Sequence, residues 1–413
     1  MSAETPTRAS ETAEARPDIS LTELVAVLAM MSATVAFATD AMLPAFPDIS
    51  AELSPDAPNR AQLLIGSFMA GLGLGTLFSG PLSDAFGRQR IAAAGSVLIV
   101  IFAMVSAFAP SLEILLAARF LQGIGSAGPR VAAMAIVRDL FRGREMAKIM
   151  SFVIFVFTLA PVFAPSIGWA LAWAFGWRSI FVSFAVFTLL STGWLMLRLP
   201  ETLAPEHKRP FRPGKLIEGV REIFSIRRVV LAMGAQTLVF AILMSSIMSS
   251  QQVFEDVFNQ GAHFHLWFGL MAILAAASNL MNARLVMRYG MRSMVKWALI
   301  CQGGLTFVVL LLNASGTLPQ SWIFPLGFVW YTSVFYLAGF GIGNLSSLAM
   351  EPVGHMAGLA ASIISAIATV VSIAIAIPIG QAFDGTLVPL TAAVVLLAAL
   401  AVLLVLKIDE AED

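Results

Sequence analysis

Charged residues are scarce in this sequence. Asp, Glu, Lys and Arg make up 12% of the 413 residues, whereas an ordinary soluble domain has about 25%. Hydrophobic residues reach 58%, and the mean hydropathy is +0.85. So few charged side chains cannot cover the surface of a soluble domain of this size. The composition therefore argues against an ordinary soluble fold and favours an integral membrane protein.

Cysteine is almost absent, since Cys301 is the only one and lies in an apolar stretch. A single cysteine excludes a disulfide framework and a cysteine metal site. The four histidines lie in loops or at expected helix ends without the spacing of a ligand set, so we expect no metal; His263 and His265 could at most sense the pH on their side of the membrane. The net charge of zero gives no electrostatic case for nucleic acid.

Long apolar runs dominate what is present. Crossing the hydrocarbon takes about 20 apolar residues per helix, and a membrane β-barrel would instead show alternating segments of about ten residues. Apolar runs bounded by charges, Gly and Pro predict twelve helices, near 23–45, 61–82, 91–109, 112–138, 146–172, 177–197, 229–250, 265–286, 293–313, 322–345, 355–380 and 386–406. The predicted fold is an all-α polytopic membrane protein with two pseudo-symmetric six-helix bundles.

The longest polar stretch divides the chain into two halves. We predict a disordered cytoplasmic tail (1–20), an N-terminal six-helix bundle (21–197), a cytoplasmic linker (198–228), a C-terminal six-helix bundle (229–406) and an acidic cytoplasmic tail (407–413). Apolar residues recur at helical spacing in the linker, at Leu216, Ile217, Val220, Ile223 and Phe224. This pattern predicts an amphipathic helix at the membrane interface, with a regulatory binding segment as the alternative.

Basic residues predict the orientation, because Lys and Arg in loops are retained on the cytoplasmic side. With both termini in the cytoplasm, 21 of the 25 basic residues fall on that side, and only Arg60 and Arg178 fall on the other. The loops SDAFGRQR and ARLVMRYGMR each place Gly and Arg at a tight turn, one in each half. Because many carriers duplicate a six-helix unit around a central cavity, this architecture favours transport.

Three charged residues fall well inside predicted spans: Asp40, Arg119 and Arg130. A charge in a membrane helix is costly and indicates a functional site by default. Burial disfavours a charged carboxylate and a nearby cation favours it, so an Asp40 that faces Arg119 could load and release a proton. A structural ion pair is the alternative, as is a snorkelling Arg119. Arg130 lies three turns after Arg119 on the same face, where substrate binding and a structural role are equally open.

The loop from Gly80 to Arg90 carries a second cluster of charge. Asp84 can pair with Arg88 or Arg90 after the chain reverses at Gly87. Such a cluster could latch neighbouring helices in one conformation and release them in another. A solvated turn that merely obeys the charge bias of cytoplasmic loops is the alternative.

Two other predicted spans contain Pro residues, which bend helices, or Gly residues, which allow close contact. Pro161, Pro165 and Gly168 predict a pliable gate in the fifth span, although a plain packing kink would have the same sequence. In the second span, Gly71, Gly73 and Gly75 follow no strand and so do not indicate a nucleotide loop. They predict close contact between helices instead.

These motifs carry a resemblance to a known family. The segment 80–90 is similar to the G-x-x-x-D-x-x-G-R-x-R signature of the major facilitator superfamily, with Ala85 where that family usually has Arg or Lys. Arg119-Phe-Leu-Gln-Gly123 resembles the R-x-x-Q-G motif of its drug:proton antiporters. The segments 39–47 (TDAMLPAFP) and 161–168 (PVFAPSIG) resemble motifs of the bicyclomycin/chloramphenicol-resistance branch.

The resemblance implies a monomeric exporter in the bacterial inner membrane that moves small amphipathic drug-like compounds or metabolites against an inward flow of protons. Asp40 would carry the coupling proton and Arg119 would tune its binding. The alternatives are a proton-linked carrier of a sugar or organic anion and, more remotely, a membrane enzyme or a non-transporting sensor. No paired carboxylates or nucleophile constellation support catalysis, so we predict no enzyme, no cofactor and no nucleic-acid partner.

Polar groups that could line a substrate cavity are few. Besides Arg130, the candidates are Gln122, Gln236, Asn279, Asn282, Trp330, Tyr331, Tyr336 and Asn344. They stand among many Met and Phe residues, which suit a pliable apolar cavity for varied lipophilic compounds. Met and Phe are also common on lipid-facing helices, so this composition does not identify a ligand.

Overall fold

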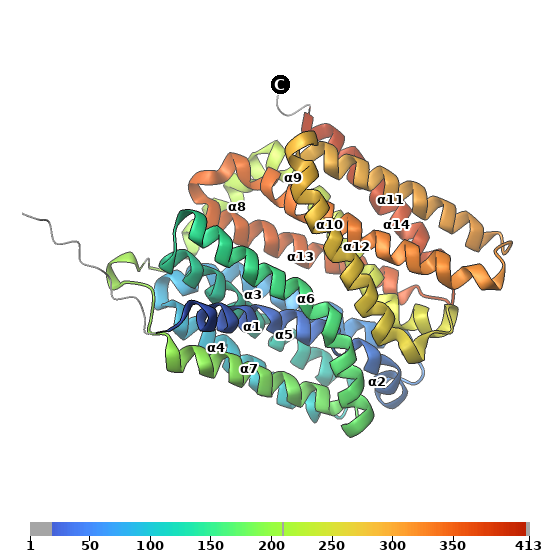
Figure 1. The fold of residues 1–413 in the computed structure, drawn as a ribbon, viewed down its shortest axis with the longest axis horizontal. Coiled ribbons are helices and arrows are strands. Elements are labelled where there is room, and N and C mark those ends of the chain that lie inside the picture. Colours follow the sequence, from blue (N-terminus) through green and yellow to red (C-terminus); the bar gives the residue numbers. More distant parts are fainter. Residues whose placement is uncertain (1–18, 209, 410–413) are drawn as a thin grey trace, which may run out of the picture.

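The computed structural model describes residues 19–208 and 210–409, and these form helices and short connections. Twelve long helices lie side by side (Figure 1). The N-terminal half contains α1 (Leu21–Asp40), α3 (Leu63–Phe86), α4 (Arg88–Ala107), α5 (Leu112–Leu140), α6 (Gly143–Phe175) and α7 (Arg178–Arg198). The C-terminal half contains α9 (Arg227–Gln252), α10 (Phe264–Tyr289), α11 (Met291–Ala314), α12 (Gln320–Met350), α13 (Ala357–Gln381) and α14 (Val388–Asp409). The prediction of an all-α, twelve-helix membrane fold is confirmed.

Short helices mark the two ends of this bundle. One end, called the η2 end below, carries α2 (Phe46–Leu53) and the short turns η1 (Leu43–Ala45), η2 (Pro58–Gln62), η4 (Val253–Val257) and η5 (Gly261–His263). The opposite end, called the α8 end, carries α8 (Pro213–Ser225), η3 (Pro205–His207) and η6 (Glu351–Met356). α1 begins and α14 finishes at the α8 end (Figure 1). The expected tail residues 1–18 and 410–413 lie outside the described residues.

Hydropathy alone finds fewer spans than the fold contains. Ten stretches of the described chain are long and apolar enough to cross a membrane, and one of them, Gln320–Gln381, covers both α12 and α13. The helix that is not among them is α5, which carries Arg119, Arg130 and a run of small residues. α5 packs between α3 and α4, where protein rather than lipid surrounds most of its length. The long helix that fails this criterion is thus the one that holds Arg119 and Arg130.

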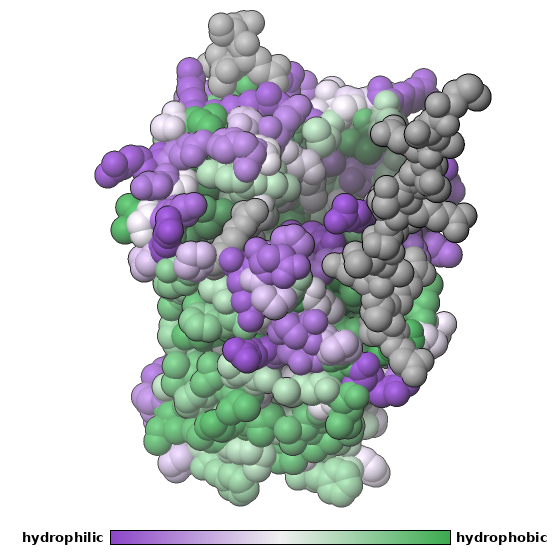
Figure 2. All heavy atoms as spheres, turned by 90° about the vertical axis from the view of Figure 1, so that its left-hand side faces the viewer, coloured by the Kyte–Doolittle hydropathy of each residue, from purple (hydrophilic) through white to green (hydrophobic). Residues whose placement is uncertain are grey.

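The linker helix α8 is present where the sequence predicts an amphipathic helix. Ile223 is buried, and Gly219 lies close to Leu359 of α13, whereas Ile217 and Phe224 are exposed. Hydrophilic residues gather over this end of the molecule (Figure 2). An amphipathic helix at the border between a polar and an apolar surface is suited to a membrane interface.

Glycines allow the closest helix contacts, as predicted. A methyl group added to Gly71 or Gly75 would collide with backbone carbonyls of α5, at Phe120 and Ile124 respectively. One added to Gly73 would lie 2.8 Å from a methyl of Val370 on α13. α3 thus packs directly against α5 within its own half and against α13 across the molecule.

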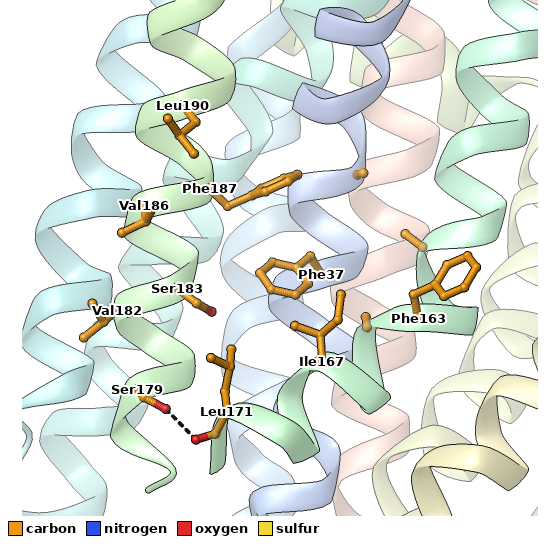
Figure 3. A pocket seen from close by; sticks show the side chains of 13 residues that line it. Phe37, Phe163, Ile167, Leu171, Ser179, Val182, Ser183, Val186, Phe187 and Leu190 are labelled. Atoms are coloured by element: carbon orange, nitrogen blue, oxygen red, sulfur yellow. Dashed lines mark hydrogen bonds between the residues drawn. The ribbon is translucent and has the colours of Figure 1, made fainter. Parts of the chain in front are cut away.

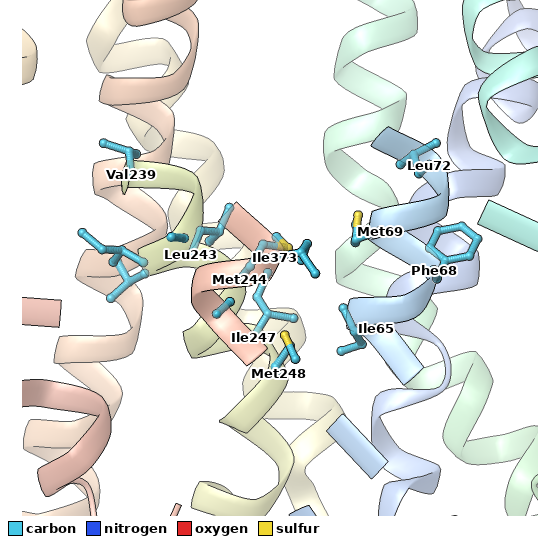
Figure 4. Close-up of a cluster of buried hydrophobic side chains, with 14 of the residues drawn as sticks. Ile65, Phe68, Met69, Leu72, Val239, Leu243, Met244, Ile247, Met248 and Ile373 are labelled. Carbon is cyan, nitrogen blue, oxygen red and sulfur yellow. The ribbon is translucent and has the colours of Figure 1, made fainter. Parts of the chain in front are cut away.

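An apolar contact region joins the two halves. Ile65 and Met69 of α3 face Met248 of α9 and Ile373 of α13, all of them buried (Figure 4). Unbranched Met side chains adapt to neighbours of different shape, so this contact does not depend on one fixed fit. A second contact between the halves is made by α6 and α10.

Candidate functional site

Arg119 is the most deeply buried cation of the described chain, with no exposed surface. Its guanidinium donates one hydrogen bond to Gln122 Oε1 and one to the carbonyl of Ala38 on α1, each at 2.8 Å. It also lies 4.3 Å from the centre of the Phe68 ring. Two neutral acceptors and an aromatic face therefore hold a charge that would be costly in an apolar site.

Asp40 is the last residue of α1 and is 6% exposed. Among the described residues it has neither an ion pair nor a hydrogen bond to its carboxyl group. Arg119 reaches α1 two residues earlier, at Ala38, rather than at this carboxyl. The structural ion pair that the sequence left open is thus not formed in this conformation, although both groups lie beside the same end of α1.

The end of α1 is fixed by its neighbours in sequence and in space. Pro44 and Pro47 follow Asp40 closely, and proline cannot donate to the preceding helical turn, so the helix gives way to the short turns η1 and α2. A methyl group on Gly168 of α6 would collide with the carbonyl of Ala41. Gly168 therefore lets α6 lie directly against the residue that follows the buried acid.

α6 bends part-way along its length (Figure 1). Pro161 and Pro165 lie inside this helix and remove two backbone donors from it. The bend and the contact at Gly168 belong to one segment, so a change in the bend would also move the wall beside Asp40. Both a gate and a fixed kink fit this geometry.

Arg130 lies on the same helix face as Arg119, eleven residues later. Its side chain is partly exposed, and it has no ion pair or hydrogen bond among the described residues. An uncommitted guanidinium is a competent partner for an anionic group of a substrate. The structure thus leaves its donors available, whereas two donors of Arg119 already bind Gln122 and Ala38.

The remaining predicted cavity residues make separate contacts on several helices. Asn344 donates to Asn282 Oδ1 at 2.8 Å, which joins α12 to α10. Trp330 is fully buried and donates to Thr306 of α11 at 3.0 Å, so its N–H is committed to helix packing. The other predicted positions differ in exposure: Gln236 and Tyr331 are buried with an unpaired oxygen, Asn279 is exposed, and Tyr336 is half-buried.

The predicted latch residues form a compact ion cluster at the α8 end. Arg88 is 8% exposed and pairs with Asp84 at 2.5 Å and with Asp139 of α5 at 2.9 Å. Arg90, the other predicted partner, is exposed and pairs with no acid in the described chain. Asp139 was missed by the sequence analysis, because an acid beside a basic loop has no distinguishing pattern of its own.

A third acid completes this cluster from the loop after α7. Glu201 accepts hydrogen bonds from the backbone N–H groups of Arg88, at 2.8 Å, and Gln89, at 3.2 Å. A carboxylate at these free N–H groups stabilises the start of α4. Gly87 has a φ of +109°, and a methyl group there would collide with the Glu201 carboxylate. The tight turn and its cap therefore need glycine at this position.

Gly80, the first residue of the predicted switch segment, lies where the two halves meet. A methyl group added there would be 3.0 Å from Ser362 Oγ of α13. Closer to the η2 end, the rings of Trp169 of α6 and His265 of α10 stack with centroids 4.5 Å apart. Gly80 and the neighbour of Gly168, Trp169, thus lie at contacts between the two halves.

Sequence comparisons agree with this arrangement. Residues 28–379 match the family model described as Major Facilitator Superfamily. A bicyclomycin resistance protein homolog of Haemophilus influenzae is 27% identical over 83% of this chain and 85% of its own length. A multidrug resistance protein MdtL of a Shewanella species (strain ANA-3) is 30% identical over 79% of this chain and 80% of its own.

Solved structures share the fold. A crystal structure of a D-xylose–proton symporter superposes with a TM-score of 0.73 at 14% identity, over 94% of this chain and 97% of that one. The human organic anion transporter MFSD10 gives 0.66 at 17% identity, over 93% and 99%. At such identities the likeness concerns the arrangement of helices alone.

Proposed function

We propose that this chain, which belongs to the Major Facilitator Superfamily, exports small amphipathic drug-like compounds or metabolites in exchange for protons. Membership in this family makes it a secondary transporter and a multi-pass membrane protein, not an enzyme. Its surroundings are therefore a lipid bilayer, and its substrate is a small molecule. We further propose a bacterial inner membrane with the α8 end in the cytoplasm, because 21 of the 25 basic residues fall on that side.

The observation that carries the proton part is the isolated acid at the end of α1. Asp40 is buried, has no ionic partner in the described chain, and lies beside the helix segment with Gly168. An isolated buried charge is costly, so an acid in a membrane span that can take up a proton is suited to carry one. Movement of the halves would expose it to one side and then to the other.

Arg119 has a separate role in this proposal. It is held by Gln122 and Ala38 in the present conformation, and both acceptors are neutral. A guanidinium that exchanges these acceptors for the Asp40 carboxylate would favour release of the proton. Arg130 would then remain for the substrate, together with the polar groups Gln236 and Asn282.

Two observations support the proposed substrate class, namely the names of similar proteins and the composition of the inward helix surfaces. The relatives carry names that refer to multidrug and bicyclomycin resistance. The inward surfaces of α3, α9 and α13 are rich in Met, Ile and Leu and poor in charge, which suits lipophilic compounds of varied shape.

Everted membrane vesicles from cells that lack their own drug pumps provide the test. We expect the wild-type chain to accumulate bicyclomycin, or another member of a panel of amphipathic drugs, when a proton gradient is imposed. Asp40→Asn should abolish both this accumulation and the substrate-induced release of protons from purified protein. Asp48→Asn changes an exposed acid nearby and should leave both unchanged.

Two results would contradict the proposal. Full accumulation and proton release by Asp40→Asn would exclude this carboxyl as the proton carrier. Drug export would be excluded if the wild-type chain accumulated none of the drugs in the panel and transported sugars or organic anions instead.

A further inference from the structure

A groove opens on the side of the N-terminal half, between α1, α6 and α7. Its volume is about 670 Å³, within the range of roughly 300–1,000 Å³ that ligand pockets have. Phe37 of α1 lies between Phe163 of α6 and Val186 of α7 among its walls, which are almost wholly apolar (Figure 3). Phe163 and Leu190 are 60% and 61% exposed, so the groove is open to the surroundings. In a membrane-spanning chain those surroundings are lipid.

The groove exists because α6 and α7 diverge from a common point. Ser179 Oγ donates to the carbonyl of Leu171 at 3.0 Å and ties the two helices together near the η2 end (Figure 3). Beyond this tie, Pro161 and Pro165 bend α6. Ala164 on the bent segment is too small to fill the space that results. The groove is thus a product of the same prolines that shape the wall beside Asp40.

The length of the groove along α7 matches the thickness of one leaflet of a bilayer. Its lining along α7 runs from Ser179, next to the η2 end, to Leu190. At 1.5 Å per residue this distance is about 16 Å, close to half of the roughly 30 Å hydrocarbon core. Trp173 and Phe175, at the η2 end of α6, are 80% and 77% exposed. An exposed Trp such as Trp173 is typical of the membrane–water interface.

We propose that this groove binds one acyl chain of a phospholipid from the leaflet at the η2 end. An acyl chain of a phospholipid in that leaflet has the length and the apolar character that fit the groove. Arg178, beside the Ser179 end of the groove, already holds Glu52 through two hydrogen bonds of 2.7 and 2.8 Å. This pair has no net charge, so the site takes a zwitterionic headgroup as readily as an anionic one.

Two rings, those of Phe37 and Phe184, would separate a bound chain from the Arg119 guanidinium. Phe37 contacts Phe184 edge to face, with ring centroids 5.3 Å apart. The ring of Phe184 in turn lies 5.9 Å from the Arg119 guanidinium. The chain would also pack against the bent part of α6 and support its separation from α7. This inference concerns lipid binding and does not depend on the direction or substrate of transport.

Photolabelling of the full chain in phosphatidylcholine vesicles tests the proposal. The vesicles contain a trace of phosphatidylcholine with a diazirine in the middle of one acyl chain, and labelled peptides are measured by mass spectrometry. The reference is the face of α4 with Val97 and Ile101, which are 56% and 49% exposed. We expect the groove to be labelled at least about five times more than this reference, the ratio that about 1 kcal/mol of preference gives.

Variants and probe positions sharpen the test. Ser183→Phe fills the groove and should reduce its labelling to the α4 level, whereas Leu189→Phe, on the exposed face of α7 outside the groove, should not. A diazirine near the ester should label the Ser179 end, and one near the terminal methyl should label the Leu190 end.

Three results would overturn the proposal. Equal labelling of the groove and of α4 in the wild-type chain would mean ordinary bilayer contact. This measurement uses the wild-type protein alone and does not depend on the folding of a variant. Undiminished labelling in a folded Ser183→Phe protein would place the bound chain elsewhere. The reverse order of the two probe positions would assign the chain to the other leaflet.

Discussion

Asn59 of η2 and Gln381 of α13 join the two halves through a pair of reciprocal hydrogen bonds. The side chain of Asn59 donates to the carbonyl of Gln381 at 3.2 Å, and the side chain of Gln381 donates to the carbonyl of Asn59 at 2.7 Å. Asn59 also donates to Phe383 at 2.8 Å and accepts from Gln252 of α9 at 3.0 Å. A neutral network of amides therefore closes the η2 end.

Asn59→Ala should open this end. It removes the three hydrogen bonds of one side chain, and a loss of about 2–3 kcal/mol would shift the population of closed molecules by a factor of roughly 30 to 150. Spin labels on cysteines at Asp56 and Ala382, in a Cys301→Ala background, would measure the change as a longer distance. Asn313→Ala is the matched control, because Asn313 donates to Val309 within its own helix. An unchanged distance distribution in Asn59→Ala would show that other contacts hold this end closed.

Arg119→Lys should abolish most transport although it keeps the positive charge. A lysine has one compact ammonium group and cannot donate in two fixed directions to Gln122 and Ala38 while covering the Phe68 ring. We expect a fall of about ten- to a hundredfold in initial drug efflux, which corresponds to about 1.4–2.7 kcal/mol.

Arg90→Lys provides the comparison for this change. Arg90 is exposed and pairs with no acid among the described residues, so its replacement should leave efflux unchanged. If Arg119→Lys retains wild-type efflux, the charge alone matters and the arrangement of donors does not.

The ion cluster at Arg88 predicts an order of importance between two acids. The side chain of Asp139 is 19% exposed and that of Asp84 is 47% exposed. An exposed pair contributes about 0.2–1 kcal/mol, whereas loss of a partner from a largely buried charge costs several times more. Asp139→Asn should therefore lower the thermal unfolding midpoint of the purified protein more than Asp84→Asn. An equal or reversed order would mean that water screens both pairs alike.

The sequence predicts the long helices well, because each must satisfy the same requirement of about 20 apolar residues. It also marks Asp40 and Arg119 as candidate site residues, since charges in such helices are costly. It does not predict where the guanidinium points: the carboxyl of Asp40, the carbonyl of Ala38 and the amide of Gln122 are all acceptors, and only the packed structure shows which are used.

Residues at the ends of helices are harder to predict. Glu201 lies in a polar loop with other charged residues near it, and nothing in its local sequence marks it as the cap of α4. Its partner residues are more than a hundred positions earlier, so the contact depends on how α7 returns to the α8 end. The groove beside α6 is hidden for the same reason, because it depends on the separation of two helices rather than on any motif.

Gly168→Ala tests how tightly α6 must lie against the end of α1. The added methyl group would collide with the backbone carbonyl of Ala41, which cannot move aside as a flexible side chain could. Overpacking of this kind costs about 1–3 kcal/mol, so the thermal unfolding midpoint and drug efflux should both fall. Gly193→Ala is the matched control, because a methyl group there meets nothing within 4 Å. Since alanine is favoured over glycine inside a helix by about 0.5–1 kcal/mol, this control should raise the midpoint slightly. A Gly168→Ala protein as stable and active as the wild type would show that α6 can withdraw from Ala41 without loss, and the link between the bent helix and the buried acid would then fail.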